Sequence, residues 1–389
     1  MSAGMFKSQH RSTAGRAGTW VAPAAGFLVL LALLLYPTFG SDSGAGTMTT
    51  FFILASAAMA LNLMFGYAGQ LSLGHSVFFG IGSYSTAVLV SKYGWSPWAT
   101  FVVAFALAFV AGLLLALPGL RIRGIYLGLV TLAFALVFPN LLRWQKLAWL
   151  TSGSAGIQDA GFDFRSMPRL ELFGLTLIDN LRSITGKTTF FYWLALLTAL
   201  VVYLACRGLV HSRVGRALVA VRDNETAATT MGVNVATTKA LVIATSAGLC
   251  ALAGSVAAIR TGNVTAESTY LTFQGAMVFL IAVILGGVGT LWGPIIGAGV
   301  YIIISDQTGS WANDENIPAI LRPVFGWAEI PPGNGIFAVL LILLMFAAPR
   351  GLAGIGTRIK EAVLAYRTRD AAVAPSEPAR ARVATWQRK

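Results

Sequence analysis

The sequence contains few charged residues. Only 11% of its 389 residues are Asp, Glu, Lys or Arg, whereas a soluble domain carries about 25%. So few charges cannot cover the surface of a water-soluble protein of this length. Long stretches contain no charge at all, the longest being 43–91 and 268–305, and 56% of the residues are hydrophobic. The composition therefore excludes a soluble fold and predicts a membrane protein.

Groups that perform chemistry are also scarce. The two cysteines, Cys206 and Cys250, predict neither a disulfide nor a metal site. The charge-free stretches hold no paired carboxylates, and the sequence has no HExxH motif and no GxxxxGK[ST] phosphate loop. Ser72 and His75, three residues apart, are weak evidence for a nucleophile and its base, because a catalytic pair also needs an orienting group and an oxyanion site. We therefore expect no catalytic residue, metal site or cofactor in this chain.

The charge-free stretches predict the spans. A helix needs roughly 20 apolar residues to cross a bilayer, and segments such as 101–117 lack the polar–apolar alternation of barrel strands. We expect an all-α integral membrane protein, a polytopic bundle of about ten transmembrane helices. The predicted spans lie near 21–39, 48–66, 76–91, 97–117, 124–142, 188–206, 240–259, 272–305 (two spans) and 334–348.

Basic residues are unevenly distributed between the loops. Segments 1–20, 118–123, 207–239 and 349–389 hold 19 of the 28 basic residues but 5 of the 15 acidic ones. The positive-inside rule places these segments, and both termini, in the cytoplasm. Three regions follow: a cytoplasmic segment 1–20, a transmembrane domain 21–349 and a basic tail 350–389. The net charge of +13 reflects this asymmetry, and we expect no nucleic-acid partner.

Each half of the chain holds a glycine-rich interruption of a long apolar stretch, at 66–82 and at 285–299. Paired interruptions of this kind mark the substrate path in transporters. The alternative is close helix packing, which glycine also permits. The candidate pathway residues are Gly69, Gln70, Ser72, Gly74, His75, Phe78, Thr131, Gly286, Gly287 and Gly289.

The predicted cytoplasmic loop 207–239 contains two short helices' worth of sequence. Apolar residues recur at helical spacing over 214–222, among three arginines. Asp223 or Asn224 can cap a second helix, Glu225 suits its first turn, and Gly232 suits its end. Such a helix pair can dock in a groove of a soluble partner, whereas the alternative is an ordinary solvated basic loop.

Several motifs resemble a known family. Ala227-Ala228, followed by three residues and Gly232, resembles the cytoplasmic coupling motif of ABC importer permeases, with the acid one position early at Glu225. Further runs resemble the branched-chain amino acid permease family, and its M-type subunit most closely. These are residues 69–84, 121–134, 213–225, 286–294 and 349–352.

The resemblance implies a set of partners in the plasma (inner) membrane. These are a sister H-type permease, two cytoplasmic ABC ATPase subunits that bind ATP and Mg, and an extracytoplasmic solute-binding protein that docks near 150–187 and 306–333. The implied substrates are branched-chain or related small amino acids. The residues implied to couple to the ATPases are Arg213, Gly215, Arg216, Arg222, Asn224, Glu225, Ala227, Ala228 and Gly232.

Other functions remain open at this point. A permease of the same family can carry urea or short amides. An ATP-independent channel or facilitator would have no need of a helix pair at 213–232. A secondary carrier would be expected to hold a buried charge within a span, and the charge-free stretches contain none. A membrane scaffold would not need paired glycine interruptions.

Overall fold

The computed structural model describes residues 32–37, 41–121, 125–158, 170–172, 175–178 and 184–313, together with residues 342, 351 and 352. The chain forms two compact units. One comprises residues 1–50 and 163–197, and the other comprises residues 51–162 and 198–389. The candidate site described below lies entirely within the second unit.

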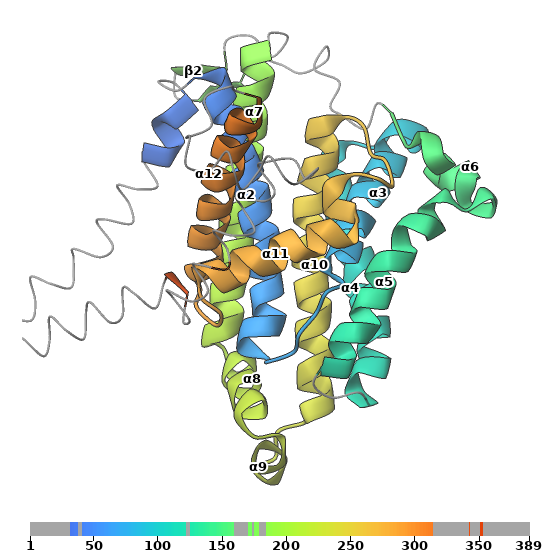
Figure 1. The fold of residues 1–389 in the computed structure, drawn as a ribbon, viewed down its shortest axis with the longest axis vertical. Coiled ribbons are helices and arrows are strands. Elements are labelled where there is room, and N and C mark those ends of the chain that lie inside the picture. Colours follow the sequence, from blue (N-terminus) through green and yellow to red (C-terminus); the bar gives the residue numbers. More distant parts are fainter. Residues whose placement is uncertain are drawn as a thin grey trace, which may run out of the picture. The chain divides into compact units, whose positions relative to one another are not determined.

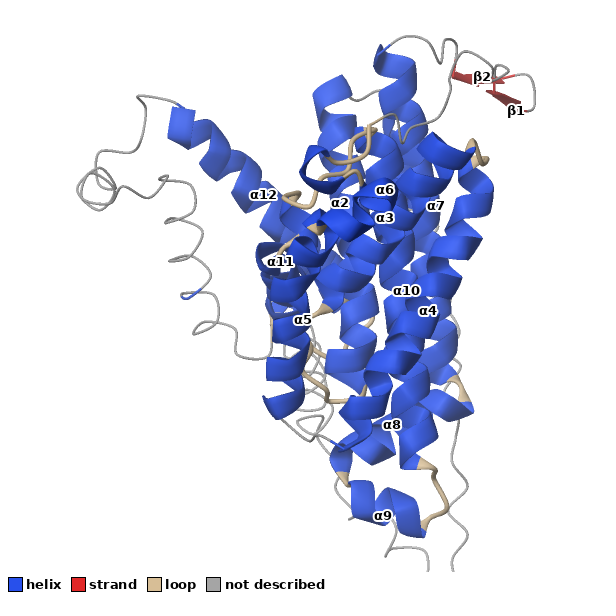
Figure 2. Cartoon of the chain, turned by 90° about the vertical axis from the view of Figure 1, so that its right-hand side faces the viewer, coloured by secondary structure: helices blue, strands red, loops and turns tan. Residues whose placement is uncertain are grey.

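The described residues are mostly helical (Figure 1). The longer helices are α2 (Asp42–Asn62), α3 (His75–Tyr93), α4 (Pro97–Arg121), α5 (Ile125–Arg143), α7 (Ile184–His211), α10 (Val235–Thr261), α11 (Phe273–Gly286) and α12 (Gly293–Asn313). The shorter ones are η3 (Leu63–Tyr67), η4 (Gln145–Leu147), α6 (Ala148–Thr151), η5 (Gly153–Ala155), α8 (Arg213–Asp223), α9 (Glu225–Thr230) and η6 (Thr269–Leu271). Figure 2 shows α4, α5 and α10 running roughly along the vertical axis of the view.

All predicted spans between residues 48 and 305 coincide with helices. Five helices of the described residues are long and apolar enough to cross a membrane: 42–67, 97–119, 126–143, 186–211 and 235–261. Helices α11 and α12 are apolar over shorter stretches. The described part of the chain is thus an α-helical, membrane-type fold.

Some predicted regions lie outside the described residues. They are the N-terminal segment 1–20, the first span apart from residues 32–37, the tenth span apart from residue 342, and the tail beyond residue 352. The same holds for most of the segment 159–187 and for residues 314–333.

A short β-hairpin lies where the sequence predicted no strand. Strand β1 (Leu170–Leu172) pairs antiparallel with β2 (Leu175–Ile178), and Leu172 is opposite Leu175. Only two residues separate these partners in the sequence, and a two-residue connection suits a tight hairpin.

Helix α10 is the core of the second unit and packs against α3 and α4. It crosses α3 where Gly82 and Gly254 face the other helix's backbone, so that a Cβ on either would collide with a carbonyl oxygen, of Ala251 or Phe79 respectively. Two hydroxyls cross the same contact: Ser83 donates to the carbonyl of Gly254 at 2.9 Å, and Ser255 donates to that of Gly82 at 3.2 Å. Small residues let the backbones approach, which is how helices associate in lipid.

Helix α4 packs on α10 and α3, helix α5 packs on α3 and α11, and both expose apolar side chains. Val102 and Leu114 of α4, and Leu136 and Val137 of α5, are all more than half exposed. Apolar side chains on a spanning helix suit contact with lipid or with another membrane protein.

The chain is non-helical between η3 and α3, and a buried histidine holds this segment. His75 Nε2 lies 2.6 Å from Ser246 Oγ, and Nδ1 lies 3.0 Å from Ser72 Oγ. Ser246 donates its single proton to the carbonyl of Ala60 at 2.6 Å, so its oxygen accepts from His75 Nε2–H. In the neutral tautomer that carries its proton on Nε2, Nδ1 accepts from the hydroxyl of Ser72. The network joins α2, α10 and the segment before α3 through one buried imidazole.

The α3–α10 crossing gives a first prediction. Gly82→Ala is expected to lower the free energy of unfolding by about 1–3 kcal/mol because the new methyl group overpacks a backbone contact. Gly208→Ala in α7 is the matched control, since nothing lies within 4 Å of its added Cβ. Thermal unfolding of the purified protein in detergent measures both. Equal midpoints for the two variants would contradict the close approach.

The histidine network gives a second prediction. Ser246→Ala removes the acceptor of a buried N–H, so it is expected to cost about 1–2 kcal/mol of stability. Thr245→Ala, one residue earlier, is the control, because the Thr245 hydroxyl bonds only to carbonyls of its own helix. The same thermal assay applies. If Thr245→Ala lowered the thermal stability as much as Ser246→Ala, the histidine network would contribute no more than an ordinary helix hydroxyl.

Candidate functional site

The two glycine interruptions meet in the folded chain. A Cβ on Gly66 would lie 2.5 Å from the backbone nitrogen of Gly289 and 2.8 Å from its Cα. The side chain of Asn62 spans the contact: its Nδ2 donates to the carbonyl of Thr290 at 2.8 Å, and its Oδ1 accepts from Gly289 N–H at 3.0 Å. We call this contact, formed by residues 62–69 and 286–293, the glycine junction.

A third segment joins the glycine junction. Gly351 has a φ of +72° and lies directly against the backbone of Gly287, so that a Cβ on Gly351 would collide with Gly287 Cα. Gly286 and Gly293 are packed equally closely on one another where α11 turns back into α12. Backbone therefore meets backbone from three separate parts of the sequence, and side chains at these positions would force them apart.

The side chain of Arg222, at the end of α8, reaches the glycine junction. Its Nη1 donates to the carbonyl of Gly66 at 3.0 Å. Its Nε and Nη2 each lie 3.1 Å from Oδ1 of the neighbouring Asp223. Gly69, with a φ of +66°, leaves room for the arginine stem, because a Cβ there would lie 2.6 Å from Arg222 Cγ. One arginine thus connects the predicted coupling loop to the transmembrane segments.

Helices α8 and α9 form at the two places where the sequence predicted short helices, below α7 and α10 in Figure 1. Ser212 caps α8 by accepting from Gly215 N–H at 3.3 Å. Of the two predicted caps for α9, Asn224 is the one used, accepting from Ala227 N–H at 3.0 Å. Gly232 has a φ of +83° just past α9, where glycine has no steric penalty.

The start of α9 is tied to α10. Glu225, at the start of α9, forms an ion pair with Lys239 in the first turns of α10. The Lys239 side chain is only 9% exposed, so this pair is shielded from solvent more than a surface salt bridge. Together with Arg222, it fixes the helix pair to the spans at two points.

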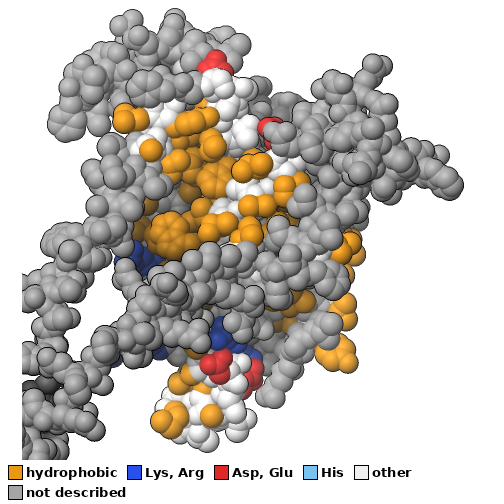
Figure 3. Space-filling model, turned by 60° about the vertical axis from the view of Figure 1, so that its left-hand side comes forward, with side chains coloured by type: hydrophobic (Ala, Val, Ile, Leu, Met, Phe, Trp, Pro, Cys, Tyr) orange, Lys and Arg blue, Asp and Glu red, His pale blue; other side chains and the backbone are white. Residues whose placement is uncertain are grey.

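The outward surface of the helix pair is mostly polar and exposes one large apolar side chain. Arg213 and Arg216 are exposed, whereas Gly215 and Ala228 are buried between the helices and the spans. Met231, just after α9, is 85% exposed. Figure 3 shows acidic side chains with basic ones beside them at the lower end of the molecule. Methionine is common at adaptable protein-binding surfaces, so Met231 suits contact with a docked partner.

The predicted pathway residues divide into two groups. Gly69, Gly286, Gly287 and Gly289 lie at the glycine junction. Ser72, Gly74, His75, Phe78 and Thr131 lie together around the histidine network.

The second group is packed against protein in this chain. Thr131 accepts from Leu73 N–H at 3.0 Å, and a Cβ on Gly74 would lie 2.9 Å from the carbonyl of Thr131. Ser72, His75 and Thr131 are at most 1% exposed. In the sequence, Gln70 lies between the two groups, and its Oε1 is buried without a hydrogen-bond partner.

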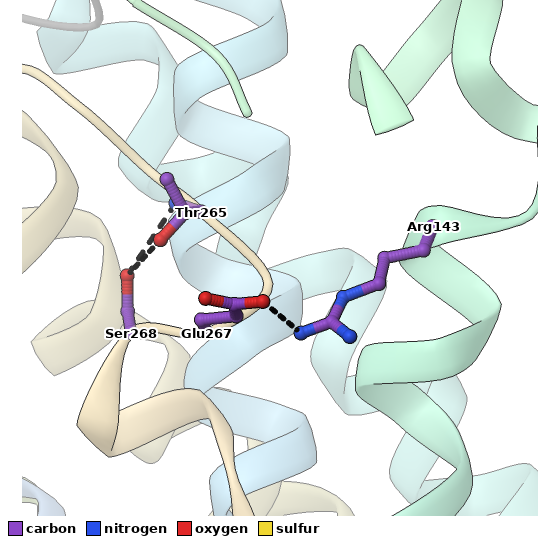
Figure 4. Close-up of polar contacts among 4 residues, drawn as sticks. All are labelled: Arg143, Thr265, Glu267 and Ser268. Atoms are coloured by element: carbon purple, nitrogen blue, oxygen red, sulfur yellow. Dashed lines mark hydrogen bonds and ion pairs between the residues drawn. The ribbon is translucent and has the colours of Figure 1, made fainter. Parts of the chain in front are cut away.

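The opposite end of α10 carries a second polar cluster, in the loop before η6 (Figure 4). Arg143 Nη2 forms an ion pair with Glu267 Oε1 at 2.8 Å, which ties α5 to this loop. Thr265 and Ser268 bond to one another across the turn at 3.2 Å. Val264 pairs with Ile157 in an antiparallel bridge. These contacts build a firm surface at the end remote from α8 and α9.

Sequence reasoning missed several residues of the site. Asn62 shows no motif, Thr290 lies in the family-like run 286–294 but had no role assigned to it, and Lys239 looked like one basic residue of an inside loop. Met231 carried no signal of its own, because single exposed apolar residues are common on protein surfaces. Among the described residues, no group of three or more His, Cys, Asp or Glu side chains could hold a metal ion.

Known proteins match most of this chain. The family model for the permease component of branched-chain amino acid transport systems matches residues 44–348. The high-affinity branched-chain amino acid transport system permease protein LivM of Escherichia coli K12 is 29% identical over 343 residues, covering 84% of this chain and 74% of that protein.

Two archaeal proteins of Methanocaldococcus jannaschii also match. A probable LivM permease is 24% identical over 76% of this chain and 88% of its own, and a probable LivH permease is 26% identical over 71% and 80%. No solved structure matches. The family model covers well over half of the sequence, and the chain therefore belongs to the family of branched-chain amino acid transport system permease components.

Proposed function

We propose that this chain is the M-type permease subunit of an ATP-driven importer for branched-chain or related small amino acids. The observation that carries the proposal is the helix pair α8–α9, anchored to the spans by Arg222 and by the Glu225–Lys239 ion pair. A channel would gain nothing from an anchored, charged helix pair outside the membrane. An importer needs such a pair to receive the movement of its ATPases.

The choice of substrate rests on the named relatives. The two LivM proteins and the LivH protein are all named as branched-chain amino acid permeases. The charge-free spans suit a zwitterionic or neutral solute, because no fixed charge would capture it on the way. Urea and short amides are the second candidates, since they share that property.

The partners follow from the same proposal. A sister H-type permease would supply the other half of the passage and cover part of the apolar surface of α4 and α5. Two ATPase subunits would bind ATP and Mg and dock on the α8–α9 helix pair in the cytoplasm. A solute-binding protein would dock at the opposite end, where the Arg143–Glu267 ion pair and the Ile157–Val264 bridge stiffen the surface.

The mechanism places the moving part of the passage at the glycine junction. Closure of the ATPases would shift α8 and α9, and the two interruptions would move with them because they touch backbone to backbone. Irregular backbone within the membrane is tolerated where it is buried in protein or lines a cavity. The histidine network would keep the start of α3 in place while the junction moves.

A transport assay tests this proposal. The chain is co-expressed with the candidate sister permease, ATPases and binding protein, and the purified complex is reconstituted in proteoliposomes. Uptake of labelled leucine, urea and acetamide is then measured with ATP and with a non-hydrolysable analogue. We expect leucine uptake that requires ATP hydrolysis. Uptake with the non-hydrolysable analogue would indicate a facilitator. Uptake of urea or acetamide in place of leucine would overturn the proposed substrate assignment.

Substitutions in the helix pair give a third prediction. Gly232→Pro and Arg216→Glu are expected to abolish leucine uptake while leaving membrane insertion intact. Proline cannot adopt the φ of +83° at Gly232, and the glutamate reverses an exposed charge on the docking surface. Uptake and membrane yield are measured in parallel.

Gly94→Pro is the matched control for Gly232→Pro. Gly94 also follows a helix with a positive φ, of +64°, but it lies at the far end of α3 from the helix pair. Gly94→Pro should retain most of the uptake. Normal uptake by both Gly232→Pro and Arg216→Glu would remove the docking assignment.

A further inference from the structure

Arg222 lies on the docking helix, but one of its hydrogen bonds reaches the transmembrane segments. The resemblance to known permeases assigns it to the surface that meets the ATPases. In the structure, its guanidinium is bonded to the carbonyl of Gly66 and to the carboxylate of Asp223. Its side chain is 38% exposed, so it is only partly available to a partner.

The carbonyl of Gly66 needs a donor because the helix ends there. Residues 63–67 form a π-helix, in which Ala68 N–H bonds to the carbonyl of Leu63, and Gln70 N–H bonds to that of Met64. The last carbonyls of a helix have no partner within it, and an unpaired carbonyl is costly within a membrane. Arg222 supplies a charged donor at 3.0 Å, which is stronger than a neutral one.

The same carbonyl belongs to the residue that touches the second interruption. Gly66 packs directly on Gly289, and Asn62 holds both Gly289 and Thr290. A displacement of the Gly66 peptide would therefore either carry residues 289 and 290 with it or break the contact between Gly66 and Gly289. Because Gly69 has no side chain, the stem of Arg222 has room to lie beside it.

We propose that Arg222 is a positioning residue that transmits the movement of α8 to the glycine junction, through its bond to the Gly66 carbonyl. The proposal rests on the function proposed above and names the residue through which the docked helix pair acts on the passage. Loss of Arg222 uncouples ATP hydrolysis from transport. It leaves ATPase docking to the residues on the outward surface of the helix pair.

The test compares Arg222→Ala, Arg222→Gln and Arg222→Lys with the wild type in the reconstituted complex. Three quantities are measured: co-purified ATPase subunits, ATP hydrolysis, and leucine transported per ATP hydrolysed. Arg222→Ala and Arg222→Gln should still co-purify with the ATPase subunits and hydrolyse ATP. Leucine transported per ATP should fall about tenfold, as expected for loss of a charge-assisted hydrogen bond. Arg222→Lys should recover part of the ratio, because it retains a charged donor.

A second pair of variants tests the same contact from the other side. Gly69→Ala places a methyl group 2.6 Å from the Arg222 stem, whereas Gly94→Ala has a similar positive φ and nothing within 4 Å. Gly69→Ala should lower the transport ratio, and Gly94→Ala should not. The double variant Gly69→Ala/Arg222→Ala should be no worse than Arg222→Ala alone, because both remove one interaction.

The outcomes separate this proposal from the function on which it depends. If Arg222→Ala loses the ATPase subunits, Arg222 belongs to the docking surface and the proposal fails. If transport per ATP is unchanged, the bond to Gly66 is passive and the proposal also fails. ATP-independent uptake by the wild-type complex would overturn the importer function and the coupling role together.

Discussion

Backbone N–H and C=O groups inside a membrane need hydrogen-bond partners, and this chain interrupts its helices twice where few partners exist. Side chains supply what the helices cannot. Asn62 serves the second interruption at Gly289 and Thr290, and Arg222 serves the first at Gly66. The interruptions also lie close enough to share these partners, because glycine leaves no side chain between them. The side chains that supply hydrogen-bond partners to the interrupted backbone thus also bring together the segments that move in the proposed mechanism.

The two ends of the second unit differ in how they are built. At the α8–α9 end, charged side chains anchor a helix pair and leave Arg213, Arg216 and Met231 facing outward. At the other end of α10, an ion pair and a short β-bridge stiffen loops without forming a projecting element. Between them, small residues pack α3 and α4 on α10. A tightly packed centre with a helix pair projecting at one end suits a permease whose conformation is changed by subunits outside the membrane.

Local patterns in the sequence predicted the elements well. The charge-free stretches located the helices between residues 48 and 305, since apolar length alone decides what can span a bilayer. The amphipathic repeat and the cap residues located α8 and α9. The β-hairpin at 170–178 was missed because its strands are short. The role of His75 was also hidden, because its partners Ser246 and Ala60 lie far away in the sequence.

The sequence by itself determined the membrane class, the helices and the family, because hydropathy, charge and motifs are properties of neighbouring residues. Tertiary structure decided which residues of separate motifs come into contact. Only the fold brings Arg222 to Gly66, 156 positions away, and sets Gly66 against Gly289. It also packs Ser72, His75 and Thr131 into the helix core. Contacts at such separations depend on how closely helices pack, and a linear pattern carries no information on that distance.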